Sequence, residues 1–443
     1  MLASNHRSLI VARSGGKILH DAALKEAAQA FFKAAQSARC ETRQQRNAAI
    51  RSGRFKKVED VVFPETPELL ALLAVAVDRS VALLGKTWHE DDIANLMWSQ
   101  AGRTGIEPSV SARTFAEDVD SLSSTPAVYL TANYILGLYD GIRELAIGPV
   151  RARYTKDAAA EFNRPERPRQ IVPGRSAGTS YPGDDRVIVS LTEMCWQVTV
   201  SASDRLIGNE AQWLINSATS LLRLSYPREI KLSSQVIPSV GALEAVPVGE
   251  PERRPTEIII SEGTFEPVHR QPELDYVVDE VTYDYLLKTD FFERAKSIFG
   301  APSTQVANRI ARGLGWMARG RQTADPAERL LFFFTALEAL LTSDDNTTPV
   351  VQTICRNAST ILTNDVNERH AIAEELKGAY RIRSGLVHGG RRSVSVAEMT
   401  YVQALAEDVY RAVLTNDATL GQKSSTFIEE LAKAGFGLPW PLA

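Results

Sequence analysis

An arginine and a histidine five positions apart, Arg383 and His388, are the side chains of this sequence best suited to chemistry. The stretch from Arg381 to Arg392 around them holds four arginines, one histidine and no acidic residue. A histidine near neutral pH can exchange a proton with an oxygen of a phosphate ester, and an arginine can bind phosphoryl oxygens through two N–H groups. In RNA the adjacent 2′-hydroxyl supplies the nucleophile, so cleavage by such a pair would need neither a metal ion nor a protein nucleophile.

Two predicted helices have to position this pair. In residues 371–387 apolar residues recur every three or four positions, and Arg383 falls on that apolar stripe. A guanidinium placed there needs an acceptor opposite it. The earlier helix, residues 329–341, is apolar on nearly every side and carries Glu338 as an almost isolated carboxylate, which needs a cation or donors. We therefore expect Glu338 to face Arg383.

Local signals mark the ends of both helices. Asp325 is a candidate N-cap, Pro326 suits the first helical position and Glu328 completes a capping box. Gly389 and Gly390 directly follow His388 and are typical of a helix C-cap.

The spacing of the pair limits how it can form one site. Five residues turn an ideal helix by about 500°, so Arg383 and His388 point about 140° apart if the helix runs straight through both. They can meet if the helix kinks or ends early near Gly385 and the glycine pair. They can also meet if two subunits bring their copies together across a dimer axis.

Spacing alone favours a structural interpretation, namely a buried Arg–Glu pair with a histidine capping a helix C-terminus. A resemblance to a known family favours a catalytic interpretation instead. Residues 329–341 read RLLFFFTALEALL and residues 380–390 read YRIRSGLVHGG. Together they resemble the Apea-like branch of the HEPN superfamily, which pairs an (I/L)EALL helix with a later Y–RN–(I/L)VHG helix end. The similarity lies within residues 283–420, under a third of the chain.

The resemblance implies a role for each matching residue. Arg383 and His388 fall on the catalytic pair, Glu338 on the acidic position of the earlier helix, and Ser384 on the polar position after the arginine, commonly Asn, Asp or His in relatives. It implies a metal-independent endoribonuclease that works as a homodimer through its C-terminal helical domain, often in bacterial anti-phage defence or toxin systems. Three further arginines are expected to contact phosphates without sequence preference: Arg381, Arg391 and Arg392.

Composition excludes several other classes. The 50 Lys and Arg against 54 Asp and Glu give a net charge of −4, so any site for a polyanion has to be local. The three cysteines lie more than a hundred residues apart and the six histidines are scattered, so the sequence predicts neither disulfides nor a metal site. No P-loop, GxGxxG or GxSxG motif occurs, and we expect no cofactor. The longest apolar stretch, residues 69–84, is interrupted by Asp78 and Arg79, which predicts no membrane span. The dispersed cysteines predict a cytoplasmic protein.

Patterning predicts a mainly α fold with several parts. Residues 1–162 are expected to be a helical N-terminal region, with helices such as 21–38, 67–84 and 126–146. The Pro- and Gly-rich residues 163–185 predict a linker. Residues 186–282 alternate as strands near 187–191 and 196–200, carry an amphipathic run at 210–224 and a short strand at 257–261, and predict a small α+β domain. Residues 283–420 are expected to be a HEPN-like helical bundle and residues 421–443 a C-terminal tail.

Two features leave alternatives open. Residues 1–57 hold twelve Lys and Arg against three Asp and Glu, which fits either an arm that faces RNA phosphates or solvated helix faces, the more ordinary case. The C-terminal domain can equally be a non-catalytic HEPN-type module that binds RNA or a partner and dimerises through the helix of Phe332–Phe334. A third hypothesis places an unrelated activity in the first 280 residues.

Overall fold

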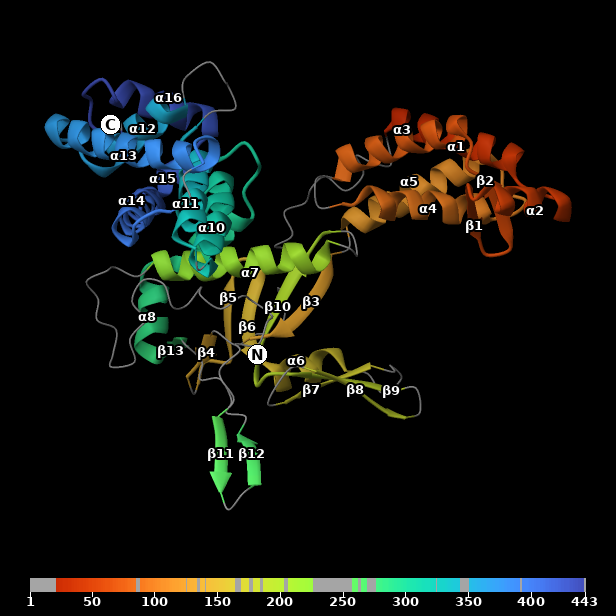
Figure 1. Ribbon diagram of the computed structural model, residues 1–443, viewed down its shortest axis with the longest axis horizontal. Coiled ribbons are helices and arrows are strands. Elements are labelled where there is room, and N and C mark those ends of the chain that lie inside the picture. Colours follow the sequence, from red (N-terminus) through yellow and green to blue (C-terminus); the bar gives the residue numbers. More distant parts are fainter. Residues whose placement is uncertain are drawn as a thin grey trace, which may run out of the picture. The chain divides into compact units, whose positions relative to one another are not determined.

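The computed structural model describes the chain as two compact units, Met1–Tyr129 with Thr199–Ala211, and Leu130–Val198 with Gln212–Ala443 (Figure 1). Within them it describes residues 21–84, 88–124, 126–133, 136–139, 141–163, 169–174, 178–183, 186–202, 206–225, 257–261, 264–268, 276–323, 325–342, 350–390 and 393–441. These residues are mainly α-helical, as the sequence predicts.

The first unit is a helical bundle with one hairpin. Its elements are α1 (Ala22–Ala38), α2 (Arg43–Ser52), β1 (Phe55–Val58), β2 (Val61–Pro64), α3 (Pro67–Leu84), α4 (Glu90–Gly102) and α5 (Pro108–Ser124). The hydrophobic core of this unit contains several aromatic side chains. Phe31 on α1 packs edge-on against Trp98 on α4, with 5.1 Å between the ring centres. Phe63 of the hairpin and Phe115 of α5 are fully buried in the same core. Trp88 and Trp98, considered above as core residues or base-stacking platforms, are both buried.

The second unit begins with strands, and the division between the units falls within β3, β10 and α7. Its first elements are β3 (Ala127–Ala132), β4 (Leu136–Leu138), β5 (Glu144–Ile147), β6 (Val150–Tyr154), α6 (Thr155–Phe162), β7 (Arg169–Pro173), β8 (Gly178–Gly183), β9 (Arg186–Leu191), β10 (Met194–Val200), α7 (Ile207–Leu224), β11 (Glu257–Ser261), β12 (Thr264–Val268) and β13 (Tyr276–Val278). Figure 1 shows strands β3, β10, β6 and β5 side by side in this order, forming a four-stranded sheet. The predicted strands at 187–191, 196–200 and 257–261 and the helix at 210–224 are confirmed.

Two predictions for this part of the chain are wrong. Residues 126–146, expected to form a helix, contain β3, β4 and β5. Residues 163–185, expected to be a linker, contain β7 and β8, which flank β9 in a three-stranded sheet. In residues 126–146 hydrogen bonding to distant strands overrides local preference: β4 pairs in parallel with β13, Leu136 opposite Tyr276. In residues 163–185 both strands pair with β9, which follows β8 directly in the sequence.

The remainder of the second unit is helical. Its elements are α8 (Glu280–Lys288), α9 (Phe291–Phe299), α10 (Val306–Gln322), α11 (Pro326–Leu341), α12 (Val350–Leu362), α13 (Val366–His388), α14 (Val396–Leu414), α15 (Asp417–Leu420) and α16 (Ser424–Ala434). The predicted boundary between 282 and 283 falls inside α8. The predicted tail 421–443 contains α16, whose Phe427 and Leu431 are fully buried, so that segment belongs to the packed unit.

Helix α11 lies at the centre of this helical region and contacts α10, α12, α13 and α14. Asp325 caps it as predicted, although the bond goes to the N–H of Ala327 at 2.8 Å and not to that of Glu328, so the predicted capping box is not formed. Phe333 and Phe334 are fully buried within the chain, while Phe332 stacks on Trp316 at 5.8 Å between ring centres. Phe333 and Phe334 therefore pack inside the bundle, and of the three aromatic residues Phe332 keeps some exposure.

Two glycines let neighbouring helices approach α10 closely. A Cβ at Gly313 would overlap the hydroxyl of Tyr410 on α14, and a Cβ at Gly315 would overlap the indole of Trp213 on α7. Tyr410 is fully buried and donates a hydrogen bond to the carbonyl oxygen of Ala336 at 2.7 Å. Through these contacts α10 holds both α7 and α14 against itself.

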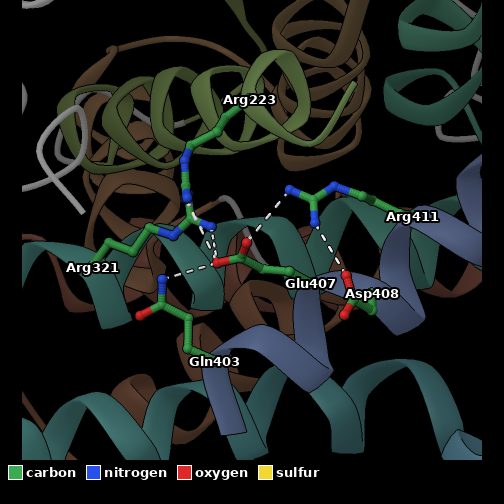
Figure 2. Close-up of polar contacts among 6 residues, drawn as sticks. All are labelled: Arg223, Arg321, Gln403, Glu407, Asp408 and Arg411. Carbon is green, nitrogen blue, oxygen red and sulfur yellow. Dashed lines mark hydrogen bonds and ion pairs between the residues drawn. The ribbon is translucent and has the colours of Figure 1, made fainter. Parts of the chain in front are cut away.

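A buried charge cluster joins the same three helices (Figure 2). The Glu407 side chain on α14 has no exposure to solvent and accepts an ion-paired hydrogen bond from Arg321 of α10, itself 1% exposed. Arg223 of α7 approaches the same carboxylate oxygen at 3.7 Å, and Arg411 approaches the other at 3.5 Å. Gln403, one turn earlier on α14, donates to Glu407 at 2.9 Å. Several donors therefore replace the water that this carboxylate has lost.

None of the described helices has the length and apolar character that crossing a membrane requires.

The Glu407 cluster yields a stability prediction. Glu407→Ala leaves Arg321 and Arg223 buried without their counter-charge, so it should lower the free energy of unfolding by about 3–5 kcal/mol. Glu407→Gln keeps the volume and part of the hydrogen bonding and should cost less. Urea unfolding followed by circular dichroism measures both.

The matched control is Asp408→Ala, at the next position of the same helix. Asp408 pairs with Arg411 at 3.2 Å but its side chain is 41% exposed, so its loss should cost no more than about 1 kcal/mol. If Glu407→Ala and Asp408→Ala lowered the free energy of unfolding equally, the buried carboxylate would contribute no more to stability than an exposed one.

Candidate functional site

Helix α13 carries most of the residues predicted to form the site. It runs without interruption from Val366 to His388 and is capped by Asp365, whose side chain accepts from the N–H groups of Asn367 and Glu368, each at 2.9 Å. At its other end the N–H of Gly389 donates to the carbonyl oxygen of Gly385 at 2.9 Å, and Gly390 has a φ of +69°. The predicted glycine C-cap is confirmed, and the option that the helix ends before His388 is wrong.

The inward face of α13 holds Arg383 where the sequence places it. Its Nη2 lies 3.3 Å from Oε1 of Glu338 on α11, and both side chains are 25% exposed. The predicted pairing of Glu338 with Arg383 is thus present. Because both groups keep some contact with water, the pair contributes modestly to stability, on the order of 1 kcal/mol or less.

Tyr380 completes this group and was assigned no role from the sequence. Its hydroxyl donates to Oε1 of Glu338 at 3.4 Å, and the Arg383 guanidinium lies over its ring at 5.1 Å. The ring also packs edge-on against Phe334 of α11 at 5.2 Å. The signal in the sequence was the three-residue spacing from Tyr380 to Arg383, which puts both on one helix face.

The outward face of α13 holds the other predicted residues. Steps of 100° per residue put Ser384 about 40° and Arg381 about 20° from His388 around the helix axis. Arg381 and His388 are exposed and Ser384 is half-buried. Lys377, exposed and paired with Glu374 at 3.1 Å, continues the same stripe. His388 therefore stands at the end of a cationic stripe and not beside Arg383.

The structure thus divides the predicted site between two faces of one helix. Glu338 and Arg383 are brought together, whereas His388 and Ser384 lie on the other face, about 140° and 100° from Arg383. Within the described part of the chain, the side chains of His388 and Ser384 make no hydrogen bond. Arg391 and Arg392 lie outside the described residues.

Other chemistry-bearing groups are less suited to a site. The described residues contain no group of three or more His, Cys, Asp or Glu side chains placed to hold a metal ion. Cys40, Cys195 and Cys355 are free and buried, and burial raises the pKa of Cys355 to about 11, which keeps this thiol protonated at neutral pH. His370 is exposed in the first turns of α13, as expected for a solvated helix start.

Comparisons of the sequence with protein-family models, with curated proteins and with solved structures found no match.

The Tyr380 group yields a prediction about titration. Burial, followed by the negative charge of Glu338, raises the pKa of Tyr380 above its usual value, while Arg383 lowers it. Glu338→Gln removes the charge that opposes the tyrosinate, so the pKa of Tyr380 should fall toward its usual value. Carbon-13 NMR of labelled tyrosine rings, followed from neutral to alkaline pH, measures the shift.

Glu374→Gln serves as the control, because Glu374 lies on α13 but pairs with Lys377 and does not contact Tyr380. It should leave the Tyr380 titration unchanged. A Glu338→Gln protein with an unaltered or raised Tyr380 pKa would contradict the described geometry.

Proposed function

We propose that the helical region from α8 to α15 is a metal-independent endoribonuclease of the HEPN type. The observation that carries the proposal is the arrangement of α13: an exposed histidine at the C-terminal end of a helix, on a cationic face, with an arginine held by a carboxylate on its other face. The resemblance of residues 329–341 and 380–390 to the Apea-like branch supplies the reaction.

The chemistry requires one base, one acid and a phosphate clamp. The ribose 2′-oxygen loses its proton and attacks the adjacent phosphorus, the P–O5′ bond breaks, and the 5′-oxygen takes up a proton. The products are a 2′,3′-cyclic phosphate and a 5′-hydroxyl. His388 is the acid–base group, and water completes the proton balance. Arg383 binds the charged phosphoryl oxygens, and Glu338 and Ser384 orient the two main residues.

The division of residues between the faces of α13 favours a site shared by two subunits. Within one chain Arg383 and His388 point about 140° apart, and α13 continues through both positions. In a homodimer His388 of one chain can lie near Arg383 of its partner, and a two-fold axis would create two such sites. Arg381, on the same face as His388, would contact the flanking phosphates, with Arg391 and Arg392 in the same proposed role.

The cellular location and biological role that we propose are taken from the same family resemblance. We place the protein in the cytoplasm of a bacterium, in an anti-phage defence or toxin-like system, with RNA as substrate. The first unit and the strands of the second would then choose the RNA or respond to a trigger.

A second candidate function is a non-catalytic HEPN-type scaffold that binds RNA or a partner protein. The observation in its favour is that Arg383 already has a carboxylate at 3.3 Å and an aromatic ring at 5.1 Å within its own chain. On this hypothesis RNA binds without turnover, and the function survives the loss of the His388 imidazole.

Product analysis separates the two candidates. The purified protein, incubated with RNA in EDTA, should leave 2′,3′-cyclic phosphate ends, and His388→Ala should reduce the rate by about 10²–10⁴-fold because the acid–base group is lost. Capillary electrophoresis of end-labelled RNA measures the rate and identifies the ends.

His370→Ala is the matched control, because His370 is an exposed histidine on the same helix. It should retain activity within about twofold. Undiminished cleavage by His388→Ala would exclude His388 as the catalyst, and absence of cleavage by the wild-type protein on a broad RNA panel would favour the scaffold.

Mixing two inactive variants tests whether the site is shared. If His388 of one chain works with Arg383 of the other, a heterodimer of Arg383→Ala and His388→Ala subunits contains one intact site. After unfolding and refolding an equal mixture, random pairing should restore about a quarter of wild-type activity. The activity is measured with the same RNA, and each variant refolded alone is the control. A mixture as inactive as its components would place both groups in one chain.

A further inference from the structure

The segment that contains α2 and β1, in the first unit, is far more basic than the protein as a whole. The chain has a net charge of −4, yet residues 39–57 hold seven Lys and Arg and one acidic residue, Glu41. Such a local excess of one charge on a folded surface raises the electrostatic free energy of the protein alone and attracts anions. A segment of this kind is a candidate binding surface for an anionic partner.

The three arginines of α2 lie on one side of the helix, which also carries exposed Ile50. Of its ten residues only Ala49 is buried. At 100° per residue, Arg43, Arg46, Asn47 and Arg51 fall within an arc of about 140°, which leaves out Ala49. All four side chains are exposed.

The hairpin brings further cations beside this face. Ala49 packs with Cys40, Val62 and Phe55, which attaches α2 to the hairpin (Figure 1). Lys57 is the cross-strand partner of Val62, so it lies on the side of the hairpin against which α2 packs. Lys57 is exposed, and so is Arg54 between α2 and β1.

Some of these cations are already used within the chain. Arg39 donates to the carbonyl oxygens of Ala101 at 2.9 Å and Arg103 at 3.0 Å, at the end of α4. Arg46 donates to the carbonyl oxygen of Cys40 at 3.3 Å. Lys56 donates to Asn95 on α4 at 2.9 Å.

The others are available to a partner. Among the described residues, four cationic side chains of this segment make no hydrogen bond or ion pair: Arg43, Arg51, Arg54 and Lys57.

The chemistry of the face selects the partner. Guanidinium and ammonium groups, with the amide of Asn47 between them, donate hydrogen bonds to phosphate and sugar oxygens along a nucleic-acid backbone. An anionic membrane is the other common polyanion, but an interfacial helix needs a broad apolar face, and the exposed apolar side chain of α2 is Ile50. The face therefore fits a nucleic-acid backbone better than a lipid surface.

We propose that α2 and β1 form a binding surface for the phosphate backbone of single-stranded RNA, separate from the residues of α13. The choice of RNA over DNA rests on the proposed function, whereas the binding itself does not. The surface would hold RNA without sequence preference and raise its local concentration near the protein.

The experiment measures RNA binding without cleavage. The full-length His388→Ala protein is titrated into a fluorescent single-stranded RNA, and anisotropy is followed over a range of KCl concentrations. Adding Arg43→Glu and Arg51→Glu should weaken binding at least tenfold near physiological salt. Because each phosphate contact in a single strand contributes about 0.7 to the slope of log K against log[salt], the slope should decrease by about 1.4 or more.

The matched control changes the net charge equally on other surfaces of the same unit. Lys33 on α1 and Arg113 on α5 are both exposed, and Lys33→Glu with Arg113→Glu should change the affinity less than about twofold. Circular dichroism establishes that all variants keep the fold.

Three results would overturn the proposal: equal weakening by both pairs, an unchanged affinity in the α2 variant, or binding to vesicles of phosphatidylserine and phosphatidylcholine that the α2 variant loses while RNA binding persists. The outcome is independent of catalysis. RNA binding that depends on α2 can stand even if the wild-type protein proves not to cleave RNA, and it can fail while cleavage remains.

Discussion

The arrangement of the second unit depends on a carboxylate that has been taken out of water. Glu407 on α14 is tolerated in the interior only because arginines reach it from α7, α10 and α14 and an amide reaches it from Gln403. Each donor has to stay within hydrogen-bonding or ion-pairing distance, so the three helices cannot shift independently. The cluster thereby ties α7, which follows the strands, to the bundle that carries the candidate site.

Helix α13 receives its orientation from that bundle. α14 and α10 hold α11, and α11 presents Phe334 and Glu338 to Tyr380 and Arg383. Once these residues face inward, the helical repeat forces Arg381, Ser384 and His388 outward. One face of α13 is therefore consumed by packing and charge pairing, while the other is a cationic surface that ends in a histidine. This separation places Arg383 and His388 on different sides of α13 within one chain.

The strands show which parts of the fold the local sequence pattern could predict and which it could not. Residues 186–224 were predicted well, because alternation and the helical period were both strong there. Residues 126–146 contain β-branched and aromatic residues but also apolar residues at helical spacing. Their strands β3 and β4 form by pairing with β10 and β13, far away in sequence, while β5 pairs with the neighbouring β6. The prolines and glycines of residues 163–185 indicate a break in regular structure. They did not reveal that β7 and β8 add to the edges of β9.

The sequence by itself determined the extent of α11, the C-terminal end of α13, the partnership of Glu338 with Arg383, and the dense positive charge of residues 39–57, because helix periodicity, capping residues and charge are local properties. The predicted start of α13, at residue 371, lies five residues after the observed one at Val366. Only the tertiary structure decided that Tyr380 joins the pair, that Phe333 and Phe334 pack within the chain, and that three arginines from α7, α10 and α14 surround Glu407. These outcomes depend on contacts between residues up to 184 positions apart, as with Arg223 and Glu407. No local pattern encodes such a contact, since its energy exists only after the chain has brought the helices together.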